Sequence, residues 1–228
     1  MEKRIIFVCE GKTDCAYLHA VQRFIENDIS IAVYGEPKLR FIPDPDPLGA
    51  GTGKYDTIVE RYNKAVQEFA PDPVNIWVDA DIYIRNEELG LNSGKFNFTE
   101  YQNRPSNIPV FHFSYHNFED FLALHYEESV FNVWKQTVLY AVSHNTSRSH
   151  SEYPLIRSEH APLFQKVFPR YSKRKSIPFD ITIDRLVNLR RNVNDLDVQS
   201  MTLLQPGVSF ASYLLDTFDT AYSGLIPS

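Results

Sequence analysis

The sequence predicts an α/β fold in which a parallel, Rossmann-like sheet is flanked by helices, with an added C-terminal helical part. Two observations predict it. Short apolar runs of strand length alternate with amphipathic segments of helix length, which is typical of β-α-β units joined by right-handed crossovers. In addition, acidic residues directly follow two of the apolar runs. In open α/β sheets, ligands gather at this carboxyl edge of the strands.

The first unit is the clearest. Residues Ile5–Cys9 form a continuous apolar run, which predicts a strand covered on both faces. Thr13 or Asp14 is expected to cap the helix that follows and that ends at Asn27-Asp28. Residues Ile29–Tyr34 and Leu39–Ile42 are interpreted as short strands, parallel to the first.

The next units repeat this alternation. Residues Tyr55–Phe69 carry apolar side chains at helical spacing and end before two prolines. Residues Val74–Val78 and Val110–Ser114 are predicted strands, and a helix is expected from His116-Asn117 through His125.

We expect two parts in the chain: an α/β core of residues 1–126 and a C-terminal helical extension of residues 127–228 packed on that core. The predicted helices of the extension are Phe131–Val142, Ala161–Phe168, Asp180–Asn192 and Val208–Tyr222.

Composition restricts the classes of protein that fit. The 228 residues are 43% hydrophobic, enough for a sizeable core, but contain no run of about 20 apolar residues of the kind that spans a membrane. Cys9 and Cys15 make no disulfide framework and no zinc pattern, and no signal peptide is evident, so we expect a cytoplasmic protein. The net charge of −6 argues against a non-specific polyanion binder without excluding a nucleic-acid enzyme.

A glycine-rich segment before the second long helix does not fit a nucleotide-binding P-loop. Gly49 and Gly53 enclose three residues where the Walker pattern needs four, and Tyr55 follows Lys54 where a Ser or Thr is required. A connecting loop is the better interpretation.

The acidic residues at strand ends are the main candidates for a functional site. Glu10 follows the first strand, Asp79 and Asp81 follow the strand Val74–Val78, and Glu119 lies at the start of a later helix. Because parallel strands end at one edge, these carboxylates are expected to converge as ligands of Mg²⁺ or Mn²⁺. The alternative is that they only cap helices and solvate loops.

Other polar groups are weaker candidates. The basic cluster Arg170–Lys175 is either a phosphate contact or a solvated face. His112 and His125 are interpreted as packed, hydrogen-bonded residues, because they lack the spacing of zinc ligands. Aromatic residues such as Phe111, Phe113 and Phe118 are interpreted as core.

These motifs resemble the Toprim domain, in which a strand followed by Glu-Gly precedes a strand followed by Asp-x-Asp. Glu10-Gly11 and Asp79-Ala80-Asp81 match the two parts. The chain is most similar to the RloB-like family of bacterial Toprim-like proteins, whose opening resembles residues 8–14, usually with Glu where this chain has Asp14. The segments Gly49–Gly53, Asn117–Tyr126 and Tyr171–Lys173 extend the likeness, although Phe121 stands in place of the family's tryptophan.

The resemblance implies roles for individual residues. Glu10 would be a general acid/base or metal ligand, Asp79 and Asp81 would bind Mg²⁺, and Glu119 would be a further ligand. The residues implied to contact phosphate are Lys12, Tyr171, Lys173 and Arg174.

The sequence thus leads to one principal hypothesis and two alternatives. The principal hypothesis is what the resemblance implies: a Mg²⁺-dependent Toprim-type phosphodiester enzyme, a nuclease acting on DNA or RNA in bacterial anti-phage defence, since members of the RloB-like family often occur near restriction-modification and anti-phage defence genes. The alternatives are a non-catalytic interaction or sensing module that binds a defence-system protein, and a nucleotide-binding or nucleotidyl-transfer protein.

Overall fold

A computed structural model describes seven segments of the chain. They are residues 2–35, 37–44, 55–79, 111–114, 118–143, 177–199 and 209–227. Asp81, the helix predicted at 161–168, and the phosphate-contact candidates Tyr171, Lys173 and Arg174 lie outside these segments.

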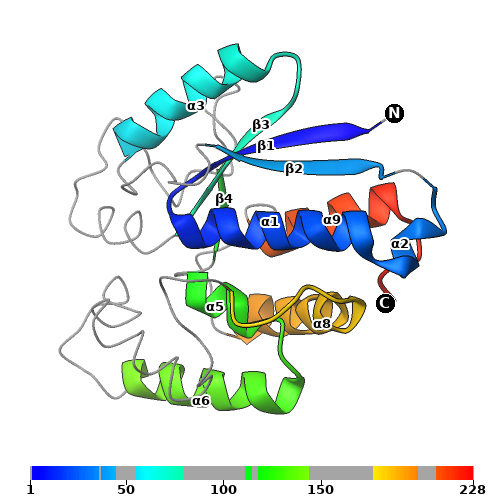
Figure 1. The fold of residues 1–228 in the computed structure, drawn as a ribbon. Coiled ribbons are helices and arrows are strands. Elements are labelled where there is room, and N and C mark those ends of the chain that lie inside the picture. Colours follow the sequence, from blue (N-terminus) through cyan, green and yellow to red (C-terminus); the bar gives the residue numbers. More distant parts are fainter. Residues whose placement is uncertain are drawn as a thin grey trace.

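The centre of the fold is a four-stranded sheet in which every strand pair is parallel, in the order β2-β1-β3-β4 (Figure 1). Its strands are β1 (Lys3–Cys9), β2 (Leu39–Asp44), β3 (Val74–Val78) and β4 (Phe111–Phe113). The α/β class and the parallel arrangement predicted from the sequence are therefore confirmed. β1 is central because its last five residues are all apolar and fully buried, so both of its faces can be covered.

The helices alternate with these strands and then follow them. They are α1 (Lys12–Asn27), α2 (Ile29–Ala32), α3 (Tyr55–Phe69), α5 (Phe118–Ala123), α6 (Glu128–Ser143), α8 (Ile183–Gln199) and α9 (Phe210–Ala221). None of the helices in the described segments is long and apolar enough to cross a membrane.

The prediction of a strand at Ile29–Tyr34 is wrong. These residues form the short helix α2 and a turn, because the Asp28 carboxylate accepts a hydrogen bond from the Ser30 N–H at 2.8 Å and caps a new helix. Gly35 follows with φ of 86°, a left-handed conformation that favours glycine. Ile29 and Val33 are about four-fifths exposed. Their β-branched side chains favoured a buried strand in the sequence, but neither side chain is buried.

The strand β2 extends two residues further than predicted. Pro43 and Asp44, expected in a loop, continue the pairing with β1. Proline is tolerated there because β2 is the edge strand of the described sheet and its outer side needs no N–H donor. This extension brings Asp44 to the carboxyl end of the sheet.

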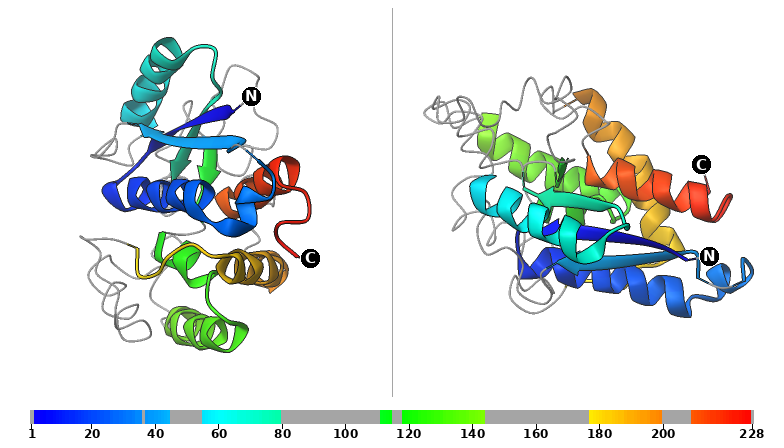
Figure 2. Two further views of the ribbon diagram at one scale, coloured as in Figure 1. Left: turned by 45° about the vertical axis from the view of Figure 1, so that its right-hand side comes forward. Right: turned by 90° about the horizontal axis from the view of Figure 1, so that it is seen from above.

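Helices cover both faces of the sheet (Figures 1 and 2). The helix α3 lies on one face, whereas α1 and α9 lie on the other. A set of rings fills the second face, and we call it the aromatic layer: Phe7, Tyr17, Trp77, Phe121 and Phe210. Its closest contact is the stacking of Trp77 on Phe210, with ring centroids 3.7 Å apart.

Further helices extend this second side. The helix α8 contacts α9 and α6, and Figure 1 shows α5, α8 and α6 beyond α1. The boundary at residue 126 stays a prediction. The helix α9, which belongs to the predicted C-terminal part, packs directly on the sheet through Phe210, since this ring contacts both Phe7 and Trp77.

Candidate functional site at the carboxyl edge

The strand order places the two principal candidate acids beside each other. β1 pairs with β2 on one side and with β3 on the other, so the chain crosses over β1 between β2 and β3. Glu10 follows β1 and Asp79 follows β3, directly at this crossing point. A topological switch point of this kind is where open parallel sheets bind ligands.

Hydrogen bonds join these two residues. The Glu10 N–H donates to the Trp77 carbonyl oxygen at 3.2 Å, which continues the pairing of β1 with β3 by one residue. The Asp79 N–H then donates to Glu10 Oε2 at 3.1 Å. The Glu10 side chain therefore crosses from one strand end to the next, and both residues are only partly buried.

The helix α1 begins at the same place. Gly11 is its N-cap, and the Asp14 carboxylate accepts a hydrogen bond from the Gly11 N–H at 2.8 Å. The expected cap at Thr13 or Asp14 is therefore wrong: Asp14 lies in the first turn and closes the cap from inside the helix. The exposed Lys12 is the first helical residue, so it lies two residues after Glu10, at the positive end of the helix dipole.

Glu119 occupies a more enclosed position. It lies in the first turn of α5 and is 2% exposed. Its neighbours Phe118 and Phe121 pack against Trp77, so α5 lies on the side of the aromatic layer. Glu119 is thus a buried acid with its own partners, and its proposed role as a metal ligand stays a prediction.

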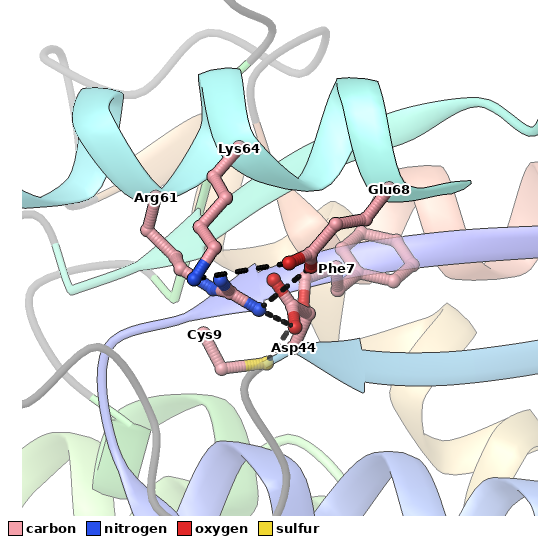
Figure 3. Close-up of polar contacts among 6 residues, drawn as sticks. All are labelled: Phe7, Cys9, Asp44, Arg61, Lys64 and Glu68. Carbon is pink, nitrogen blue, oxygen red and sulfur yellow. Dashed lines mark hydrogen bonds and ion pairs between the residues drawn. The ribbon is translucent and has the colours of Figure 1, made fainter. Parts of the chain in front are cut away.

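The sequence analysis missed a third acid at the carboxyl edge. Asp44 ends β2, is 4% exposed, and forms an ion pair with Arg61 of α3 (Figure 3). The pair raises the pKa of the Arg61 guanidinium, chiefly through the hydrogen bond to Asp44. The signal was available: Asp44 is an acid at the end of an apolar run, which is the criterion that selected Glu10 and Asp79.

The two cysteines near this edge, Cys9 and Cys15, are buried and form no disulfide with each other. Burial raises the pKa of the Cys9 thiol well above its usual value, and the adjacent Cys15, Asp14 and Asp44 raise it further. A thiol in such surroundings stays protonated at neutral pH and is a poor nucleophile or metal ligand. We therefore assign Cys9 to the core.

The histidines are packed as predicted. His112 is 3% exposed and lies against the Tyr213 ring, with a centroid distance of 4.2 Å. His125 is fully buried and bonded to Tyr17 at 2.7 Å. Phe111, Phe113 and Phe118 are buried as well, which confirms their interpretation as core residues.

The donor atoms at the switch point suit a hard divalent cation. Carboxylate oxygens are the ligands that Mg²⁺ and Mn²⁺ prefer, and one or two of them suffice when water and substrate complete the shell. Within the segments that the structure describes, no group of three or more His, Cys, Asp or Glu side chains is arranged to hold a metal ion. Glu10 and Asp79 together therefore offer at most a partial ligand set among the described residues.

Comparison with other proteins gives no family. The sequence matches no protein-family model, and neither curated proteins nor solved structures show a match. The established result is the α/β fold with its all-parallel sheet in a Rossmann-like arrangement.

Proposed function

We propose that this protein is a Mg²⁺-dependent phosphodiester enzyme of the Toprim type, acting as a nuclease in bacterial anti-phage or restriction-associated defence. One observation carries the proposal: Glu10, directly after β1, accepts a hydrogen bond across the switch point from the backbone N–H of Asp79, directly after β3. Glu10 of the Glu-Gly motif and Asp79, the first acid of the Asp-x-Asp motif, lie far apart in the sequence and are joined at the edge where such sheets bind ligands.

The residues of this edge can divide the work of phosphodiester hydrolysis. A divalent cation, when bound, supplies electrostatic stabilisation of the phosphate and a water of lowered pKa. Glu10 is partly exposed and can accept or return a proton at its carboxylate, while Asp79 and Asp81 provide oxygen ligands. The N-terminus of α1 and Lys12 favour an anionic substrate group beside them.

The decisive test compares isosteric substitutions. Glu10→Gln and Asp79→Asn are expected to lower Mg²⁺-dependent cleavage of DNA or RNA at least a hundredfold, and to weaken Mn²⁺ binding in calorimetry, because each removes a charged oxygen ligand. Glu26→Gln, an exposed acid on α1, makes the same chemical change away from the edge and should leave both measurements unaltered.

Two results would contradict the proposal. One is undiminished cleavage by a folded Glu10→Gln/Asp79→Asn double variant. The other is a wild-type protein that binds no divalent cation but forms a stable complex with a protein partner, which would identify a non-catalytic interaction module.

A nucleotide-binding or nucleotidyl-transfer protein is the second candidate. The observation that favours it is the start of α1 at the switch point, because the N-terminus of a 16-residue helix begins two residues after Glu10. Thermal-shift measurements with nucleoside triphosphates and Mg²⁺ test this candidate, since a ligand that binds the folded state raises the melting temperature, and cleavage assays on the same samples separate it from the first.

A further inference from the structure

The ion pair between Asp44 and Arg61 is unusual for its position. Asp44 pairs in register with Val8 of β1, two residues before Glu10, so it lies at the carboxyl edge. Arg61 comes from α3, which covers the face opposite the aromatic layer. Only 6% of the Asp44 side chain and 20% of the Arg61 side chain are exposed.

Hydrogen bonding within this pair is incomplete. Arg61 binds Asp44 Oδ1 through Nη2 alone, and the same Nη2 lies 3.3 Å from Glu68 Oε2 (Figure 3). Among the described residues, the buried Arg61 Nε and Asp44 Oδ2 have no hydrogen-bond partner. Arginine-carboxylate pairs frequently use the guanidinium fork for two parallel bonds, and leaving a buried polar atom unsatisfied costs about 1–3 kcal/mol.

The buried Nε and Oδ2 are out of reach of a ligand, but Arg61 Nη1 is not among the buried atoms and donates no hydrogen bond to a described residue, so it suits a ligand that carries acceptor oxygens. A guanidinium donor at the edge of the sheet matches a phosphate group, for which arginine is well suited. Asp44 fixes the orientation of Arg61 by accepting a hydrogen bond from its Nη2. Arg61 also forms an ion pair with Glu68, so its guanidinium lies between two acids, Asp44 and Glu68. Glu68 in turn contacts Lys64 at 3.8 Å.

We propose that Arg61 binds a backbone phosphate of a nucleic-acid substrate at the carboxyl edge, with Asp44 as its positioning residue. This inference rests on the proposed function and adds a substrate contact from α3, outside the Glu-Gly and Asp-x-Asp motifs. The site then has acids at the ends of β1 and β3 and a phosphate-binding guanidinium beside the end of β2.

The test measures binding of labelled DNA and RNA oligonucleotides by fluorescence anisotropy, with EDTA and with calcium in place of magnesium. Arg61→Gln is expected to weaken binding about tenfold, as the loss of one charged hydrogen bond implies. For the Arg61→Gln variant, the slope of log oligonucleotide affinity against log salt concentration should also become less steep by about 0.7–0.9, the contribution of one phosphate contact. Lys64→Gln is the matched control, since it removes the same charge from the same helix at a 65% exposed side chain and should change affinity less than twofold.

Asp44→Asn separates substrate binding from a structural role. The amide keeps Oδ1 as an acceptor for Arg61 and removes a negative charge near the phosphate, so this variant should bind at least as tightly as the wild type. If Arg61→Gln alone is too unstable, the neutral double variant Asp44→Asn/Arg61→Gln is expected to show the same tenfold loss, with folding checked by thermal melts.

Each outcome has a defined meaning. Three results would overturn the inference. In the first, Arg61→Gln and Lys64→Gln change oligonucleotide affinity equally; in the second, Asp44→Asn loses as much affinity as Arg61→Gln. The third is a wild-type protein that binds no oligonucleotide. Cleavage with Mg²⁺ is measured on the same samples. Binding that depends on Arg61 but leads to no cleavage would contradict the proposed reaction and leave the role of Arg61 intact. Cleavage in a protein whose binding does not depend on Arg61 would contradict the role of Arg61 and leave the proposed reaction intact.

Discussion

The carboxyl edge and the aromatic layer are two regions of one sheet with opposite chemistry. At the edge, Glu10, Asp44 and Asp79 bring carboxylates to the strand ends, and Glu10 and Asp79 are partly exposed. In the aromatic layer, a few residues earlier on the same strands, Phe7 and Trp77 are fully buried. Position along the strand therefore decides whether a side chain serves ligand binding or packing.

This contrast has a physical origin. The interior of a parallel sheet is covered by helices on both faces, so an unpaired charge there would lose its hydration. The ends of β1 and β3 leave Glu10 and Asp79 partly exposed, so a charge there keeps part of its hydration, whereas the buried Asp44 at the end of β2 is paired with Arg61. We therefore expect substitutions in the aromatic layer to change stability without changing ligand binding, and the reverse at the edge.

The strongest test of this separation is Phe210→Ala. Phe210 is fully buried and contacts Phe7, Trp77 and Phe121, so its removal should lower the free energy of unfolding by about 3–5 kcal/mol. Urea denaturation measures this loss. Metal affinity of the folded variant should stay within twofold of wild type, while Glu10→Gln should change stability by less than about 1 kcal/mol. A Phe210→Ala variant that is stable but has lost metal binding would show that the two regions are coupled.

His125 makes one part of the buried core sensitive to pH. The pKa of His125 is lowered to about 3 from an ordinary 6.5, chiefly by burial and also by the nearby Arg185, although the hydrogen bond to the Phe121 carbonyl oxygen opposes this shift. Because that oxygen can only accept, Nδ1 carries the proton, and Tyr17 donates its hydroxyl hydrogen to Nε2. The folded state therefore holds a neutral imidazole inside the core.

We expect stability to fall as pH falls through the window between 6.5 and 3. Below pH 6.5 His125 becomes protonated in the unfolded chain but stays neutral in the folded protein. The free energy of unfolding is therefore expected to fall by about 2 kcal/mol between pH 6.5 and 5. Urea denaturation of His125→Gln should show this part of the pH dependence removed. Tyr17→Phe keeps the buried imidazole and should retain it, although it is less stable throughout. Equal pH dependence in wild type and His125→Gln would refute the assignment.

Much of the fold followed from local patterns in the sequence. The runs Ile5–Cys9 and Val74–Val78 and the helix Tyr55–Phe69 were predicted correctly, because continuous apolar runs and helical spacing reflect burial on two faces or on one. Residues Ile29–Tyr34 were not, since β-branched side chains resemble a strand in sequence and only the Asp28 cap decides for a helix. Local propensity is ambiguous in so short a segment.

The site was predictable only in part. Glu10 and Asp79 were placed correctly at strand ends, but their direct hydrogen bond depends on the strand order, which no local pattern specifies. The Asp44–Arg61 pair was missed because its two residues come from a strand and a helix that meet only in three dimensions. Local sequence patterns predicted most of the helices and strands, but not the contacts between them.

The smallest expected effect concerns the cap of the helix that carries Phe210. Ser209 is the N-cap of α9, is 1% exposed, and accepts a hydrogen bond from the Ser212 N–H at 3.4 Å. Ser209→Ala should lower the free energy of unfolding by about 1 kcal/mol, the usual value of an N-cap, without altering metal or oligonucleotide binding. Ser212→Ala makes the same change three residues later and keeps the donor N–H, so thermal melts should show a smaller shift. A loss of unfolding free energy above about 3 kcal/mol for Ser209→Ala would exceed the contribution of an N-cap. Such a loss would mean that the backbone bridge between Ser209 and Phe113 holds α9 against the sheet. The aromatic layer would then depend on a polar contact at its border.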